Sequence, residues 1–228
     1  MRSVWEDEIN PSQLLWRYFK TSRFLSFLES ASLYFAPLTQ FVDPFEGAVA
    51  VIPPKFIDPR YVELDFEDKV FRELKEYTNV NCWHQAEHES DAMWRLYAEE
   101  TKGVVICSTL SRMKSAIAPF CFTPQSKPEE LWVGPVRYVD LTQVRIRESG
   151  IERFFYKHVV FESEREFRLA LDLEFARLFT GRLKPEGVFV SVDAKLLVER
   201  VILGPLLPEK ERDQISKYVH EAELGDRL

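Results

Sequence analysis

The segment LLWRYFKTSRFLSFLESASLYFAP, which runs from Leu14 to Pro37, decides the fold class of this chain. Its first six residues, Leu14 to Phe19, form a compact aromatic and aliphatic run that is typical of a β-strand. The apolar residues of Thr21 to Glu29 then recur at helical spacing, and hydroxyl side chains at the start of that stretch can cap a helix. Ser32 to Ala36 is another short apolar run, and a proline follows it. The segment therefore predicts a strand, a helix and a second strand in that order.

The rest of the chain carries further helix and strand patterns in an irregular order. Helical periodicity is found over Asp65–Tyr77, Ser90–Ala98, Ile151–Val160 and Glu209–Ala222. Strand-like apolar runs are found over Asn79–His84, Val104–Cys107, Trp132–Val139, Phe161–Leu171, Gly187–Val192 and Val198–Leu203. The lack of a βαβ rhythm predicts an α+β fold, with a mixed or antiparallel sheet and flanking helices. A chain of 228 residues suits a single domain over 1–228, with its core in 14–205 and a C-terminal helix in 206–228.

Composition excludes several broad classes of protein. Hydrophobic residues make up 46% of the chain and aromatic residues 14%, enough to bury a sizeable core, so the chain is not disordered. The net charge of −7 argues against binding nucleic acid through bulk charge. No apolar run approaches the ~20 residues of a membrane span, and charged residues interrupt the first ten positions, unlike a secretory leader. We therefore expect a cytoplasmic protein without a membrane partner.

Cysteine and histidine are too sparse to predict a metal centre. The three cysteines form no CxxC pair, so neither a disulfide framework nor a structural zinc site is expected. His84 and His88 have i,i+4 spacing, but a metal site also needs a separated third ligand. Asp193-Ala194-Lys195 superficially fits half of a metal-dependent nuclease motif, but Asp193 is better interpreted as a helix N-cap. No metal is therefore expected.

In the most densely charged segment, Phe161 to Leu171, charged residues stand at every second position from Glu162 to Arg168, while Phe161, Phe167 and Leu169 fall on the other face. Period-two alternation predicts a strand, whose charged face would hold Glu162, Glu164, Glu166 and Arg168. Two carboxylates at Glu164 and Glu166 would then lie about 7 Å apart, with Arg168 or Lys157 as the cation between them. Such a pair can stabilise an oxocarbenium-like transition state, which makes Glu166 and Glu164 candidate catalytic residues. The alternative is a solvated face or a charged, protected edge strand.

Arg17 lies between two aromatic residues in the first predicted strand. A guanidinium fixed in this way can offer its planar fork to a phosphate group. The alternative is a half-exposed arginine that pairs with a surface carboxylate.

A helical stripe of Met93, Trp94 and Tyr97 follows Ser90, a residue type that favours the N-cap position. The stripe is typical of a buried core, although an aromatic stripe can also serve as a ligand platform. Gly103, just after this helix, suits a left-handed C-terminal cap. Further upstream, Asp43 is followed by proline, which predicts an Asx-type turn, and Asp43 and Glu46 are candidates to line a cleft.

An ordered set of these motifs resembles the bacterial domain-of-unknown-function family numbered twenty-nine seventy-one. The matching motifs are Trp16-Arg17-Tyr18, Leu33-Tyr34-Phe35, Phe41-x-Asp43-Pro44-Phe45-Glu46, Met93-Trp94-x-x-Tyr97-Ala98, Lys102-Gly103-Val104 and Glu164-x-Glu166-x-Arg168. The resemblance covers roughly Leu14 to Pro205 and implies a shared fold.

More distantly, the chain resembles the ADP-ribosyltransferase superfamily. Those folds open with strand, helix and strand, carry Arg or His on the first strand and end with a glutamate on a late strand. The resemblance implies that Arg17 holds an NAD phosphate or ribose and that Glu166 or Glu164 is the catalytic glutamate. The residue that walls the nicotinamide pocket has three candidates, Ser108, Tyr34 and Tyr97.

Two classes of function follow. The first is an NAD-dependent ADP-ribosyltransferase-like or NAD-cleaving enzyme, with NAD as its substrate. The second is a non-catalytic module that binds a nucleotide or a protein partner. A metal-dependent nuclease is a distant third. The candidate cofactor-binding residues are Arg17, Tyr18, Tyr34, Trp94 and Tyr97.

Overall fold

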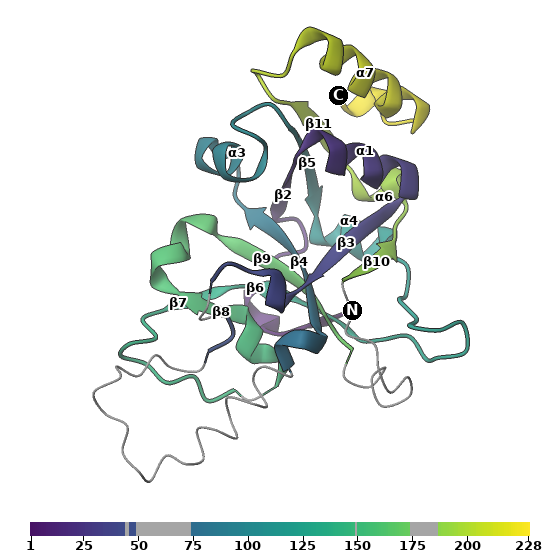
Figure 1. The fold of residues 1–228 in the computed structure, drawn as a ribbon. Helices are drawn as coiled ribbons and strands as arrows, with labels where there is room; N and C mark the ends of the chain where they lie inside the picture. The colour runs from purple at the N-terminus through teal and green to yellow at the C-terminus, as the bar shows by residue number, and fades with distance from the viewer. Residues whose placement is uncertain (44–45, 49–73, 149, 174–186) are drawn as a thin grey trace. The chain divides into compact units, whose positions relative to one another are not determined.

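The computed structural model describes residues 1–43, 46–48, 74–148, 150–173 and 187–228 (Figure 1). The fold is α+β with a mixed nine-stranded sheet, which confirms the expected class. The described chain divides into two compact units, each assembled from separate stretches of sequence. Unit 1 comprises Met1–Glu8, Phe35–Asn81 and Cys121–Val188, and unit 2 comprises Ile9–Tyr34, Cys82–Phe120 and Phe189–Leu228.

Unit 2 is built on β2 (Leu14–Phe19), the strand that opens the decisive segment. β2 pairs antiparallel with β5 (Val104–Thr109) along its whole length, and the other edge of β5 pairs antiparallel with β11 (Arg200–Leu203). The second half of β4 (Thr78–Gln85) pairs with β2, and β3 (Ser32–Pro37) pairs with β10 (Val188–Ser191). The helices are α1 (Thr21–Ser30), α3 (Asp91–Tyr97), α4 (Leu110–Ala116), α6 (Ala194–Leu197), α7 (Glu209–Glu221) and η7 (Gly225–Arg227). Helices α1 and α7 contact each other, as the upper part of Figure 1 shows.

The predicted strand, helix and strand are all present, because in each of them the residues that define the sequence pattern are also the residues that pack in the core. Every residue of β5 is buried, as expected for a continuous apolar run in the middle of a sheet. Helix α1 buries Phe24 and Phe27, whose rings pack on Phe19 of β2 with centroids 5.9 Å and 5.8 Å away. The aromatic residues that define the sequence pattern therefore hold α1 against its own preceding strand.

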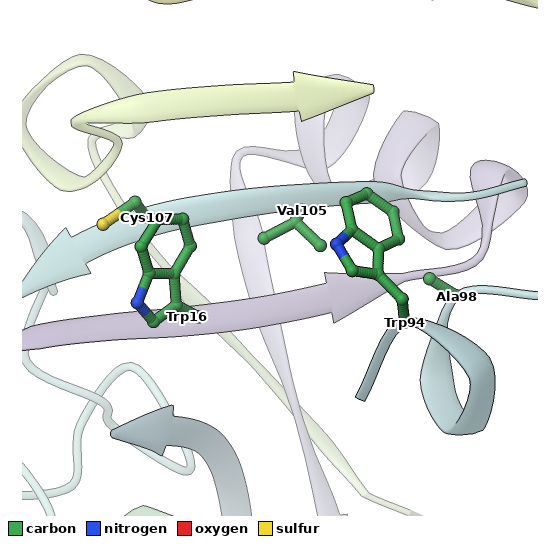
Figure 2. Packing of buried hydrophobic residues seen from close by; sticks show 5 residues of the cluster. All are labelled: Trp16, Trp94, Ala98, Val105 and Cys107. Atoms are coloured by element: carbon green, nitrogen blue, oxygen red, sulfur yellow. The ribbon is translucent and has the colours of Figure 1, made fainter. Parts of the chain in front are cut away.

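The stripe on α3 is part of the core, as predicted. Met93 and Trp94 are buried, and Trp94 lies in a cluster with Trp16, Val105, Ala98 and Cys107. Figure 2 shows Trp94 between Val105 and Ala98, and Trp16 beside Cys107. Two of the three stripe residues are therefore buried, while Tyr97 remains 45% exposed.

The connection from α3 to β5 differs from the sequence prediction. Gly103 does not adopt the left-handed conformation; Glu99, Glu100 and Thr101 do, with φ of 51°, 55° and 73°. Gly103 is required for a different reason, since a Cβ at this position would lie 2.0 Å from the carbonyl oxygen of Phe19. The left-handed turn thus precedes the glycine, and the glycine lets the chain pass close to β2.

Unit 1 contains the parallel pairing that makes the sheet mixed. β1 (Arg2–Ser3) runs parallel to β6 (Leu131–Pro135), and β6 runs antiparallel to β9 (Glu166–Asp172). A separate two-stranded sheet pairs β7 (Arg137–Val139) with β8 (Tyr156–His158) in parallel. The 3-10 helices are η1 (Glu6–Glu8), η2 (Leu38–Gln40), η5 (Ile151–Phe155) and η6 (Val159–Glu164). The single strand expected over Trp132–Val139 is therefore two strands in different sheets.

The predicted strand over Phe161–Leu171 is wrong in its first half. Residues up to Glu164 belong to η6, Arg165 has a φ of 39° and ends it, and β9 begins at Glu166. Glu162 and Glu164 therefore do not share a strand face with Glu166 and Arg168. The continuous helix expected over Ile151–Val160 is also wrong, since η5, β8 and the start of η6 occupy it.

Two further expectations concern the helix predicted over Asp65–Tyr77 and the absence of a membrane-spanning helix. The helix expected over Asp65–Tyr77 lies outside the described residues except at its end, where residues 74–77 are helical. Within the described parts of the chain, no helix has the length and apolar character needed to cross a membrane.

Candidate functional site

Unit 2 contains a pocket of about 250 Å³ that brings together residues from β2, α1, β3, α3 and β10. Its basic lining residues are Arg17, Lys20 and Arg23. Its aromatic lining residues are Tyr18, Phe19, Phe27, Tyr34, Tyr97 and Phe189, and the lining is completed by Ser26, Ser32 and Leu33. Four of the five predicted cofactor-binding residues therefore line one pocket.

Arg17 is held rigidly by β2 and by the neighbouring strand β4. Its Nη1 donates a hydrogen bond to the carbonyl oxygen of Cys82 at 2.6 Å. The guanidinium carbon lies 5.3 Å from the ring centre of Phe19 and 5.9 Å from that of Trp83. One nitrogen and two aromatic rings thus fix the plane of the guanidinium group.

The opposite edge of the Arg17 guanidinium has no acceptor among the described residues. Its Nε is buried without a hydrogen-bond partner, and no described carboxylate forms an ion pair with the side chain. Burial lowers the pKa of Arg17 to about 10, so the group is still charged at neutral pH. The described residues thus do not support the alternative of a surface ion pair. They leave a half-buried, fixed positive charge whose Nε has no hydrogen-bond partner.

Two more cations reach the pocket from α1 and its N-cap. Lys20 and Arg23 are three residues apart and are both exposed. Neither has an acidic partner among the described residues, and no aspartate or glutamate lines the pocket. In a chain of net charge −7, this local excess of three positive charges favours an anion as the ligand.

Tyr18 connects the pocket to the start of α3. Its Oη accepts a 2.7 Å hydrogen bond from the backbone N–H of Ser90, and its ring packs edge-on against Trp94 with centroids 5.6 Å apart. Burial raises the pKa of Tyr18 to about 12, so the phenol keeps its proton at neutral pH. Ser90 occupies the N-cap position of α3 as predicted, but its side chain makes no capping hydrogen bond.

Trp94 lies behind the pocket instead of lining it. It is 4% exposed, and its Nε1 donates to Glu89 Oε2 at 2.6 Å. The indole is therefore a core residue that supports Tyr18.

The mouth of the pocket is aromatic. Tyr34 and Phe189 have ring centres 5.2 Å apart, and the guanidinium of Arg23 lies 6.0 Å from the Tyr34 ring. Phe189 is 55% exposed and Tyr97 is 45% exposed. Lys20, Arg23 and Phe189 were not identified from the sequence, although the spacing of the two cations on one helix face is a signal that could have found them.

The predicted carboxylate pair is present in unit 1, but it is built by a turn. Glu164 comes from the end of η6 and Glu166 from the start of β9. Lys157 Nζ donates to Glu164 Oε2 at 2.6 Å and contacts Glu166 Oε2 at 3.5 Å. Burial alone would lower the pKa of Lys157, but the carboxylates, led by Glu166, hold it above its usual value. The expectation of a cation between the two acids is confirmed, with Lys157 in that position.

Arg168 completes a buried ion network around Glu166. Its Nε and Nη2 donate to the two oxygens of Glu166 at 2.8 Å and 2.9 Å, and its Nη1 donates to Glu46 Oε1 and to the Phe154 carbonyl. Arg168 and Glu46 are fully buried, and Glu166 is 6% exposed. The charged face is therefore buried, so the alternative of a solvated strand face is wrong. Both oxygens of Glu166 are engaged by cations.

The remaining candidates have structural partners. Asp43 is buried, and its backbone carbonyl accepts a hydrogen bond from the N–H of Glu46 at 3.3 Å; Pro44 and Phe45, which complete the predicted turn, lie outside the described residues. Asp193 caps α6 by accepting from the backbone N–H of Leu196, and Lys195 pairs with Glu223. The half-motif of a metal nuclease is thus occupied by a cap and an ion pair. In the described parts of the chain, no group of three or more His, Cys, Asp or Glu side chains could hold a metal ion.

The two sets of predicted site residues belong to different units. Arg17, Tyr18, Tyr34 and Tyr97 line the pocket of unit 2, and Glu164 and Glu166 belong to the ion network of unit 1. Ser108, the third candidate for the middle wall, is fully buried, and its Oγ donates to the Leu197 carbonyl at 2.6 Å. Comparison of the chain with protein-family models, curated proteins and solved structures finds no match.

Proposed function

We propose that the pocket of unit 2 binds a small ligand through a phosphate group. The observation that carries the proposal is the guanidinium of Arg17, which lines the pocket, is half-buried and charged, and has no acidic partner among the described residues. Partly burying a charge without a partner is unfavourable, and an anionic ligand would supply the missing partner. Arg17 lines the pocket, and a guanidinium group offers planar N–H donors that match the oxygens of a phosphate.

Lys20 and Arg23 support the same ligand chemistry. They add positive charge along one wall of the pocket, and no carboxylate in the lining opposes them. Phosphate ligands carry up to two negative charges at neutral pH, so three cations can compensate them fully. This is the binding-module interpretation of the sequence, with its ligand specified by charge.

Titration calorimetry of the whole chain with inorganic phosphate and with phosphate monoesters tests the proposal. A ligand at a hundred times its dissociation constant also stabilises the fold by about 2.7 kcal/mol, which a thermal-shift measurement detects. Arg17→Gln should abolish binding, while Arg95→Gln, an exposed arginine of unit 2 paired with Asp91, should leave it unchanged. Wild-type protein that binds none of these ligands would contradict the proposal.

A second candidate function is cleavage of NAD or ADP-ribosyl transfer from it, as the distant resemblance implies. The observation that favours it is the carboxylate pair of Glu164 and Glu166, which meets at Lys157. In hydrolysis the glycosidic C–N bond of NAD breaks, water adds to the ribose carbon, and nicotinamide, ADP-ribose and a proton are released. A carboxylate such as Glu166 would stabilise the positive charge that develops on the ribose.

Nicotinamide release from NAD is the direct assay for this second function. Glu166→Gln keeps the size of the side chain and removes its negative charge, so it should lower turnover by roughly 10²–10³. Because it also removes a carboxylate that neutralises the buried Arg168, turnover is compared only after a melting curve shows that the variant is folded. Glu162→Gln, in the same 3-10 helix as Glu164 but outside the ion network, is the matched control. If the wild-type protein releases no nicotinamide, alone or with candidate acceptors, the enzymatic function is not supported and the binding function stands on its own evidence.

A further inference from the structure

We infer that the natural ligand of the unit 2 pocket is a nucleoside monophosphate, whose base stacks on the aromatic mouth while its phosphate meets Arg17. The inference rests on the proposed phosphate-binding function and extends it to the second half of the ligand.

The first observation is the position of Phe189. Along β10 the side chains alternate, with Val190 buried and Phe189 on the opposite face, 55% exposed. Tyr34 occupies the equivalent outer face of β3 between buried Leu33 and Phe35, and its ring contacts Phe189. Two neighbouring strands therefore present aromatic rings outwards, into the lining of the pocket instead of into the core.

Tyr97 adds a third ring from a different element. It follows the buried Met93 and Trp94 on α3, but it stays 45% exposed and lines the pocket. Exposed aromatic rings that surround a hollow are well suited to stack on a planar base, and every nucleobase has a face that allows this. Inorganic phosphate and sugar phosphates have no planar aromatic ring that could stack on these residues.

The second observation is the size of the pocket. Its volume of about 250 Å³ lies just below the range of roughly 300–1,000 Å³ that is usual for pockets holding drug-sized ligands. One base, one sugar and one phosphate are closer to this size than the two nucleotide halves of NAD. The volume therefore favours a mononucleotide over a dinucleotide.

The third observation is the division of the lining by chemistry. The cations Arg17, Lys20 and Arg23 come from β2 and α1, whereas the exposed rings Phe189 and Tyr97 come from β10 and α3. A ligand with an anionic end and a planar end satisfies both groups at once. A nucleoside without phosphate, or a phosphate without a base, satisfies only one of them.

Calorimetric titration of the full chain with AMP, UMP, ribose 5-phosphate, adenosine, inorganic phosphate and NAD tests the inference. We expect AMP or UMP to bind at least about fivefold more tightly than ribose 5-phosphate, the lower end of a base-stacking contribution. Phe189→Leu should remove that difference and leave the affinity for ribose 5-phosphate unchanged. Leu206→Ala, which shortens another exposed apolar residue of unit 2, should change neither.

The outcomes separate this inference from the proposed function. Equal binding of AMP, UMP and ribose 5-phosphate would overturn the nucleotide inference and leave phosphate binding intact. If NAD binds more tightly than both mononucleotides, the ligand is a dinucleotide and the inference is overturned. If the preference for AMP or UMP survives in Phe189→Leu, the base does not stack on Phe189 and that part of the inference is overturned. If no phosphate compound binds, the proposed function fails and the inference fails with it.

Discussion

Two arginines show how the environment of a residue distinguishes a structural charge from a functional one. Arg17 and Arg168 are both on strands, Arg168 fully buried and Arg17 half-buried with a buried Nε. Arg168 is neutralised by the carboxylates of Glu166 and Glu46, whereas no described carboxylate neutralises Arg17. The sequence placed each arginine in a strand but could not reveal its partners, because Glu46 lies 122 positions from Arg168.

The first prediction concerns Arg168. Arg168→Met should lower the free energy of unfolding by about 3–5 kcal/mol, because it leaves the carboxylates of Glu46 and Glu166 buried with less compensating charge. Urea denaturation followed by circular dichroism measures the change. Arg95→Met, which breaks only an exposed ion pair with Asp91, should cost less than about 1 kcal/mol. A similar cost for both variants would show that the buried network does not hold unit 1 together.

The second prediction concerns Trp94. Trp94→Ala should destabilise the fold by roughly 3–5 kcal/mol, because the indole packs on Trp16, Val105 and Ala98 and its removal leaves a cavity. Leu96→Ala, on the same helix but 65% exposed, should stay within about 0.5 kcal/mol of the wild type. Thermal and urea unfolding of both variants provide the comparison. An unchanged melting temperature for Trp94→Ala would contradict the assignment of this residue to the core.

At the scale of elements, prediction from sequence succeeded where local pattern and tertiary packing agree. The strand, helix and strand of Leu14–Pro37 are such a case, since the apolar positions of α1 are the ones that pack on β2. Prediction failed at Phe161–Leu171, because the period-two spacing of the charged residues from Glu162 to Arg168 imitates a strand, while a left-handed residue at Arg165 separates η6 from β9. No residue type in that stretch marks the break, since left-handed conformations usually fall on glycine or asparagine.

The third prediction concerns the left-handed turn after α3. A non-glycine residue in this conformation costs roughly 1–2 kcal/mol, and Glu100 is exposed with a φ of 55°. Glu100→Gly should therefore raise the free energy of unfolding by up to about 1 kcal/mol, after the entropy that glycine adds to the unfolded chain is subtracted. Urea denaturation measures this gain.

The control for this turn is a glycine placed in a regular helix. Glu211→Gly, in the first turn of α7, should be neutral or destabilising, by up to about 1 kcal/mol. If Glu100→Gly destabilises the protein as much as Glu211→Gly does, the left-handed turn is not a source of strain.

At the scale of the molecule, the sequence predicted some residues of the pocket and some of the ion network, but not the complete set of either. Arg17 could be proposed because it stands between two aromatic residues in a strand-like run, and Tyr34 because the distant resemblance makes it a candidate for the wall of the pocket. Phe189 could not, because an exposed phenylalanine and a buried one have the same local pattern and differ only in what packs on the strand. The carboxylate pair was proposed because Glu164 and Glu166 were expected on one face of a strand. In the structure a turn separates them, and both contact Lys157.

The last prediction concerns the cooperativity of the whole chain. Strands β3 and β4 each contribute residues to both units, so neither unit can unfold without disordering part of a strand that the other unit uses. We therefore expect one cooperative transition, in which backbone amides of β5 and β9 exchange through openings of equal free energy. Hydrogen exchange followed by mass spectrometry at increasing urea concentrations measures both strands in one experiment.

The decisive version of that experiment uses a variant changed in only one unit. Arg168→Met lies in unit 1, yet cooperative unfolding requires it to lower the opening free energy of β5 in unit 2 by the same amount as that of β9. If β9 opens more easily while β5 is unchanged, the units are independent in stability despite their shared strands. In that case the phosphate pocket of unit 2 should also keep its ligand affinity in the Arg168→Met protein, which calorimetry can check directly.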